Sequence, residues 1–175
     1  GGTDPELGLV LDLSAVAGLD AETLELGLGQ GASLAALFRP HPAISVAAGG
    51  HIFALYGEGP VAWLGTRAGL RLHLGALLGL EPDLWVEANH IWGLSGSVAR
   101  HGLDMGLGIA FPFFDAVYAG PSVHLQYVED PDGTPVWLVS LGLSVVGWPA
   151  RSAEDAPEAW VSPARAPRYV APRTV

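Results

Sequence analysis

The chain of 175 residues contains no cysteine and no lysine, and only 15% of its residues are charged. Without cysteine there is no disulfide framework, thiolate metal site or cysteine nucleophile. The eight positive charges are all arginines, and against eighteen acidic residues they leave a net charge of −10. A chain with this negative charge would not displace the counterions along a phosphate backbone, so we expect no nucleic-acid partner. A water-exposed surface would also be short of charge, because about 25% charged residues is usual.

Targeting and membrane-helix signals are weak as well. Gly1 to Glu6 carries neither a basic region nor an apolar core, so we predict no signal peptide in this sequence. Residues 40–57 and 133–150 carry no charge, but glycine, proline and histidine interrupt the first, and the second alternates with a period of two. Neither stretch resembles the run of about 20 apolar residues that a spanning helix needs.

What the chain has instead is a hydrophobic period of two along most of its length. From Glu6 to Ala17 the odd positions are leucine or alanine, and Gly102 to Phe113 alternates large apolar residues with glycine and aspartate. Because side chains alternate between the two faces of a strand, each such segment has one apolar face and one small or polar face. The strands predicted in this way are Glu6–Ala17, Glu22–Phe38, Ala43–Tyr56, Thr66–Leu78, Leu84–Leu94, Gly102–Phe113, Ala116–Tyr127 and Val136–Trp148.

Eight amphipathic strands joined by turns predict an all-β, antiparallel, up-and-down barrel over residues 6–148, after a lead-in at 1–5. The face opposite the leucines carries glycine, serine and alanine with few charges, which is too bare for a wet surface. It suits the narrow interior of an eight-stranded barrel, which has room only for side chains. We therefore predict a transmembrane barrel with leucines toward lipid. A soluble, lipocalin-like binder with leucines inside is the alternative.

Aromatic residues near the strand ends support a membrane barrel. Apolar walls flanked by two aromatic girdles are typical of outer-membrane barrels. The residues expected near the rims are Tyr56, Trp63, Trp92, Tyr127 and Trp137 at one end, and Phe38, Trp85, Phe111, Phe113, Phe114, Tyr118 and Trp148 at the other.

In this architecture residues 6–148 are similar to the N-terminal transmembrane domain of the outer membrane protein A family. The resemblance implies a bacterial outer-membrane location. It also implies that residues 149–175 form a periplasmic linker, since they contain five prolines, seven alanines and four arginines. The peptidoglycan-binding domain that often follows in that family is not carried over. Within the tail, four residues are predicted to bind a protein partner: Trp160, Arg165, Arg168 and Tyr169.

Charged residues on the small face predict a polar network inside the barrel. Arginine forks suit buried carboxylates, and a buried charge needs a partner. The predicted members are Asp12, Glu25, Arg67, Arg71, His73, Glu87, Asp104 and His124. A network of this kind would plug the lumen and leave a structural anchor that docks another protein. The alternative is a narrow pore gated by exchange among these ion pairs.

No enzyme, metal site or cofactor is predicted. Metal-binding spacings are missing, and the pair Ser122 and His124 would point into the lumen, away from lipid substrates. Two polar residues conflict with the alternation, because Gln30 and His90 would face lipid near mid-strand. We predict β-bulges near Gly29–Gly31 and beside Asn89 that turn them inward; the alternative is a partner that covers them.

Overall fold

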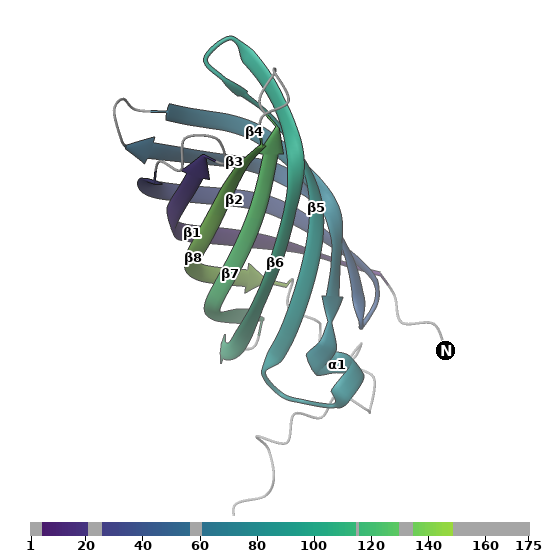
Figure 1. Cartoon of the computed structure of the whole chain (residues 1–175). Coiled ribbons are helices and arrows are strands. Elements are labelled where there is room, and N and C mark those ends of the chain that lie inside the picture. The colour runs from purple at the N-terminus through teal and green to yellow at the C-terminus, as the bar shows by residue number, and fades with distance from the viewer. Residues whose placement is uncertain (1–4, 21–25, 57–60, 115, 130–134, 149–175) are drawn as a thin grey trace, which may run out of the picture.

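The computed structural model describes residues 5–20, 26–56, 61–114, 116–129 and 135–148. Its strands form a closed antiparallel barrel in chain order, with β8 paired back to β1 (Figure 1). The elements are β1 (Glu6–Asp20), β2 (Leu26–His41), β3 (Ile44–Tyr56), β4 (Val61–His73), α1 (Leu74–Leu78), β5 (Asp83–Ser95), β6 (Val98–Phe114), β7 (Val117–Glu129) and β8 (Pro135–Gly147). The predicted eight-stranded barrel is confirmed. The predicted tail, 149–175, lies outside the described residues.

The two ends of the barrel differ. One end, here called the α1 end, holds α1, the start of β1 and the end of β8, where Leu9 pairs with Gly147. The other, here called the hairpin end, holds the β5–β6 hairpin, in which Ser95 pairs with Val98 (Figure 1). Among the described residues no helix is long and apolar enough to cross a membrane.

The outer wall is apolar, as the alternation predicts. Leucines at odd positions of β1 are exposed, whereas Val10 and Asp12 between them are buried. On β6 the same alternation exposes Leu103, Met105 and Leu107. The lipocalin-like alternative, with leucines inside, is therefore wrong: the leucines cover the outside.

The fourth strand ends earlier than predicted. β4 stops at His73, and Leu74–Leu78 forms α1 in place of the expected strand end. Leucine and alanine are good helix formers, and Gly79 adopts the left-handed conformation (φ 66°) that closes a short helix. The apolar alternation of the sequence thus continues past the end of β4 into a short helix, where it does not indicate a strand.

The bulges predicted for Gln30 and His90 do not form. The register runs unbroken through Gln30, which pairs with Ala15 and Ala54, and through His90, which pairs with Ala68 and Leu103. Both side chains therefore face outward. Gln30 Nε2 lies 3.4 Å from the Tyr56 hydroxyl, and the ring of His90 meets that of Trp92 edge-on at 4.0 Å. Register shifts between the described strands lie elsewhere, at Phe38/His41 and Pro112/Phe114.

Four of the predicted girdle residues point inward. Trp63 and Trp85 are buried in the lumen, half-buried Trp148 packs against an interior cluster, and Tyr118 shares the inward parity of β7 and pairs with buried Val146. Trp63 lies an even number of residues from Arg67, and Trp85 from Glu87, so each tryptophan is on the same face of its strand as the buried charged residue. This alternation, and not closeness to a rim, determines that both point inward. The exposed girdle residues are Tyr56, Trp92, Trp137, Phe38, Phe111, Phe113 and Phe114, and partly exposed Tyr127 stacks edge-on against Trp137.

Candidate functional site: the interior of the barrel

Apolar side chains pack together in the interior toward the hairpin end. The buried cluster, here called the apolar cap, consists of Val16, Phe53, Trp63, Ile91, Val128 and Leu138. The rings of Phe53 and Trp63 stack with centroids 5.6 Å apart, and the Trp63 indole donates a hydrogen bond to His51 Nε2. Because these residues come from six different strands, the cap bridges the barrel from wall to wall.

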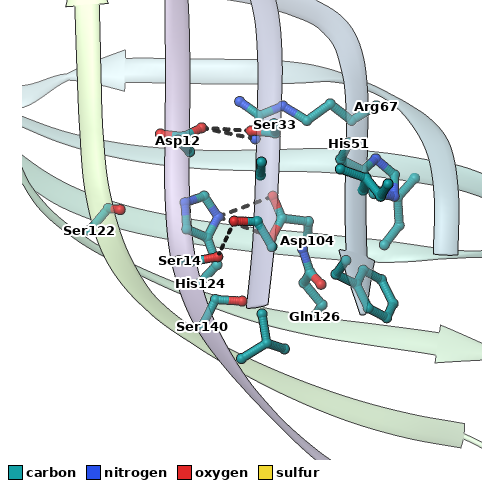
Figure 2. A pocket seen from close by; sticks show the side chains of 16 residues that line it. Asp12, Ser14, Ser33, His51, Arg67, Asp104, Ser122, His124, Gln126 and Ser140 are labelled. Atoms are coloured by element: carbon teal, nitrogen blue, oxygen red, sulfur yellow. Dashed lines mark hydrogen bonds and ion pairs between the residues drawn. The ribbon is translucent and has the colours of Figure 1, made fainter. Parts of the chain in front are cut away.

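Arg67 links both sides of the barrel beneath the apolar cap. Its Nη1 lies 3.4 Å from Asp12 Oδ2 on β1 (Figure 2). The same nitrogen lies 3.7 Å from Glu87 Oε1 on β5. Asp12 also accepts a hydrogen bond from Ser33 Oγ at 2.9 Å. The Arg67 side chain is only 4% exposed, so its charge depends on these carboxylates for compensation.

Arg71 forms the second guanidinium contact. Its Nη2 lies 2.9 Å from Glu87 Oε2, and its Nε donates to the same oxygen at 2.9 Å. The guanidinium also lies over the ring of Trp85, 4.0 Å from its centroid. Arginine combines a planar fork with a face that stacks on aromatic rings, which lysine cannot do. This explains why an arginine fits between Glu87 and a buried tryptophan.

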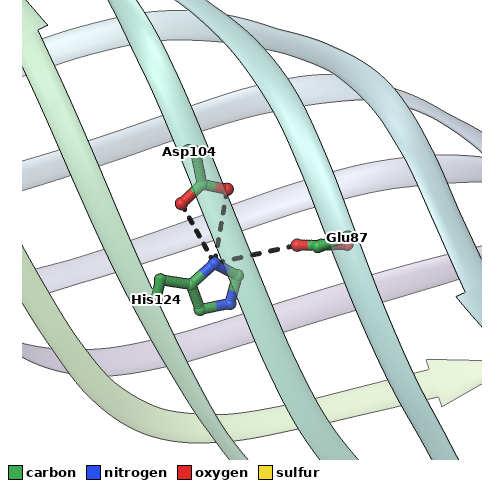
Figure 3. A group of neighbouring side chains, drawn as sticks. All are labelled: Glu87, Asp104 and His124. Atoms are coloured by element: carbon green, nitrogen blue, oxygen red, sulfur yellow. Dashed lines mark hydrogen bonds and ion pairs between the residues drawn. The ribbon is translucent and has the colours of Figure 1, made fainter.

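The third part of the network joins Asp104 to His124. His124 Nδ1 lies 3.1 Å from Asp104 Oδ1 and 3.7 Å from Glu87 Oε1 (Figure 3). Asn89 Nδ2 donates to Asp104 Oδ2 at 3.0 Å. Figure 3 shows both carboxylates directed at the same imidazole nitrogen. The network therefore runs from β1 through β4 and β5 to β6 and β7.

Glu87, Asp104 and His124 could in principle hold a cation, because their ligand atoms lie within 4.8 Å of one another. The arginines argue for a different interpretation. The buried carboxylates are those of Asp12, Glu87 and Asp104. Their three negative charges would be balanced by Arg67, Arg71 and a protonated His124. A divalent cation would leave the buried cluster with excess positive charge. The arrangement is best explained as an ion-pair network.

A small cavity lies within this polar layer. It measures about 40 Å³ and is lined by residues including Asp12, His51, Arg67 and His124 (Figure 2). A cavity of about 10–15 Å³ holds one buried water molecule, so this cavity suits a few. It is too small for a nutrient-sized solute.

The structure places seven of the eight predicted network residues inside the barrel; Glu25 lies outside the described residues. The pairing differs in detail from the prediction. Asp104 binds His124 and Asn89 in place of an arginine, and His73 belongs to a separate group at the α1 end. Ser122 and His124 both point inward, as predicted.

Sequence reasoning missed His51, Asn89 and Ser33. Extending the alternation strictly along β2, β3 and β5 would have found all three, because each lies between outward-facing neighbours.

No protein-family model and no curated protein matches the chain. Solved structures of similar fold include the following two. Neisserial surface protein A has 13% sequence identity and a TM-score of 0.64, with coverage of 81% of this chain and 96% of that one. Ail, the attachment invasion locus protein of Yersinia pestis, has 14% identity and a TM-score of 0.52, with 82% and 99% covered. The chain therefore has the fold of small eight-stranded outer-membrane β-barrels.

Proposed function

We propose that the chain is a structural outer-membrane barrel with a closed lumen, and that it anchors or docks another protein. The apolar outer wall supports the membrane location, because a continuous exposed belt of leucine, isoleucine, valine and phenylalanine is stable only against lipid. A closed barrel also leaves no unpaired strand edge within the bilayer.

The packing of charged and apolar side chains across the lumen is the observation that supports this proposal. Arg67 bridges carboxylates on opposite sides of the barrel, and the apolar cap lies above it. An ion crossing this section would have to separate buried ion pairs and then pass the apolar cap, whose side chains offer one polar group, the Trp63 indole N–H that already binds His51. Both steps are costly in a low-dielectric interior.

Planar-bilayer recording tests the closed lumen. We expect no discrete conductance steps from the parent protein. Trp63→Ala removes the largest side chain of the apolar cap, so it should increase ion leak if that layer is part of the seal. Trp92→Ala is the matched control, because Trp92 is an outward-facing tryptophan on the adjacent strand. Regular steps from the parent would contradict the proposal and support the gated pore.

The proposed docking surface lies on the outer wall around His90. A polar imidazole facing the hydrocarbon is costly, and membrane proteins usually place such groups against protein. Small side chains at Ala48, Ala68 and Ala88 lie to one side of it, which would allow close approach of a partner there. The larger Leu103 and Trp92 flank it on the other side. The opposite wall is built from leucines such as Leu141.

Photocrosslinking in native outer membranes tests the docking surface. A benzoylphenylalanine at Ala68 should form a discrete protein adduct that the same probe at Leu141 does not. Equal lipid-only labelling at both positions would remove this surface from the proposal. The tail residues Trp160, Arg165, Arg168 and Tyr169 remain a proposed second contact, tested by partner recovery with Trp160→Ala combined with Tyr169→Ala.

Topology is also part of the proposal. Because the strand count is even, both ends of the barrel chain emerge on the same side, which in this class is the periplasm. Protease added to intact cells should therefore spare the tail. Cleavage at Arg151 under those conditions would place the tail outside the cell and contradict the proposed orientation.

A further inference from the structure

Three adjacent strands bring a serine, a histidine and an aspartate together at the α1 end. Ser45 on β3 pairs with Arg71 on β4, so His73, two residues further on, is its diagonal neighbour. His73 pairs with Trp85 on β5, which makes Asp83 its diagonal neighbour on the other side. Diagonal neighbours on one face of a sheet are within reach of each other's longer side chains. The strand register therefore assembles this group.

Two short hydrogen bonds connect the three side chains. His73 Nε2 lies 2.7 Å from Ser45 Oγ, and His73 Nδ1 lies 2.7 Å from Asp83 Oδ2. An ionised carboxylate only accepts hydrogen bonds, so Nδ1 donates to Asp83. In the neutral imidazole this leaves Nε2 as the acceptor for the serine hydroxyl. Asp83 thus selects the tautomer in which histidine can remove a proton from serine.

The surroundings hold this group rigidly. The backbone amide of His73 donates to the Ala43 carbonyl at 2.8 Å, which ties the end of β4 to the residue before β3. The Trp148 ring meets the His73 ring edge-on at 6.1 Å and lies under the Arg39 guanidinium, which pairs with Glu6. Ser45 and His73 are buried, whereas Asp83 is partly exposed.

Two other interior serines have different partners. Ser33 donates to the Asp12 carboxylate, and Ser14 lies 3.5 Å from the Gly31 carbonyl oxygen. A carboxylate is a weaker base than an imidazole, and a backbone carbonyl is weaker still, so neither contact activates a serine as His73 can. Ser45 also has Arg71 as its direct cross-strand neighbour, and Arg71 Nη1 has no hydrogen-bond partner among the described residues. A guanidinium beside the serine could stabilise a developing oxyanion.

We propose that Ser45, His73 and Asp83 form a nucleophilic site for carboxylic esters at the α1 end of the barrel. Ser45 Oγ bonds to the ester carbonyl carbon while its proton moves to His73 Nε2. The tetrahedral intermediate collapses by breaking the carbon–oxygen bond to the alcohol, which leaves with that proton. Water then attacks the acyl-serine in the same way, releasing the carboxylic acid and restoring the hydroxyl.

This activity goes beyond the proposed structural role and departs from the expectation of a non-enzymatic protein. It requires the substrate to reach Ser45 from the α1 end, past Trp148, the large side chain that packs beside His73. The lumen above can stay closed throughout. Failure of this proposal would therefore leave the conductance test of the proposed function unaffected.

Covalent labelling of the full chain in detergent tests the site. An alkyl fluorophosphonate should phosphonylate Ser45, identified by peptide mass spectrometry, and p-nitrophenyl butyrate should be hydrolysed. Ser45→Ala should abolish both signals. His73→Gln should slow labelling by roughly 100-fold or more, the usual contribution of a general base. Asp83→Asn should also slow it, because the amide no longer selects the same tautomer.

Matched variants separate reactivity from damage to the fold. Ser144→Ala, at another buried interior serine, should label at the parental rate. Trp148→Ala should label faster than the parent, since it widens the approach to His73. Retained heat-modifiable migration on gels shows that each variant is folded. Absence of label at Ser45 in both the parent and Trp148→Ala would overturn the proposal, and so would labelling that His73→Gln leaves unchanged.

Discussion

On β6, Leu107 points outward and is 54% exposed, while its neighbour Gly106 is buried in the lumen. A Cβ built on Gly106 would lie 2.7 Å from the His124 ring and 3.0 Å from Glu87 Cγ. The same strand thus meets two different surroundings. Fluid lipid adapts to the outer wall, so only the polarity of a side chain matters there. The interior is packed and charged, so the volume, shape and charge of each residue all matter.

The largest effect is expected from removing a charge inside. Arg67→Met leaves the buried carboxylates of Asp12 and Glu87 without one of their partners, which should cost about 3–5 kcal/mol of unfolding free energy. Urea unfolding in lipid vesicles measures this. Arg100→Met, at a partly exposed arginine near the β5–β6 hairpin, should cost less than about 1 kcal/mol. Equal losses of unfolding free energy in the two variants would mean that the interior ion pairs contribute no more to stability than an arginine at the rim.

A charge added outside should have the next largest effect. Leu107→Arg places a guanidinium on the lipid face near the middle of β6, at an expected cost of about 2–4 kcal/mol. Leu72→Arg lies next to the last residue of β4 and should cost less, because the penalty falls toward the interface. The same unfolding assay measures both. If both variants were as stable as the parent, the wall would not face lipid.

Added volume should distinguish the faces without any charge. Gly106→Leu overfills the lumen against His124 and Glu87 and should destabilise by about 1–3 kcal/mol. Gly50→Leu is the matched control, because Gly50 is exposed and a Cβ there comes no closer than 3.5 Å to a neighbour. Thermal unfolding of the two variants should separate them clearly. A similar loss in both would contradict the adaptable outer surface.

The smallest expected difference comes from one methylene group. Ile91→Val in the apolar cap should cost about 0.5–1.5 kcal/mol, since the interior cannot fill the space. Leu141→Val on the outer wall should change stability by less than about 0.5 kcal/mol, because lipid replaces the lost contact. Paired urea titrations compare the two. A larger loss at Leu141 would reverse the comparison.

Alternation was sufficient to predict the barrel and most of its polar interior. It located Asp12, Arg67, Glu87 and Asp104 on the inward face, because one parity holds along each strand. Trp63 and Trp85 were predicted as girdle residues because they lie near a rim, but they share the parity of the buried charges on their strands and are buried. The outward positions of Gln30 and His90 teach the same lesson: the register is stronger evidence than the polarity of one residue.

Pairing between strands was beyond the reach of the sequence. The ion pairs depend on which residues lie opposite each other, and the period of two fixes faces but no register. The group of Ser45, His73 and Asp83 needs two registers at once. The predicted strands Thr66–Leu78 and Leu84–Leu94 leave Asp83 outside any strand, whereas in the structure β5 begins at Asp83 and α1 replaces the end of the predicted strand.

The pairing of β1 with β8 also sets the order of assembly. These are the first and last strands of the barrel, so most of the chain must be collapsed or held in place before they can meet. Until β8 docks, β1 and β7 each present a row of unpaired amides and carbonyls, which invites association with other chains. A chain interrupted within β8 would have two such edges at once, and we expect it to aggregate instead of settling as a seven-stranded form. Pairing of β8 with β1 therefore determines whether an inserting chain forms a closed barrel with no unpaired strand edge.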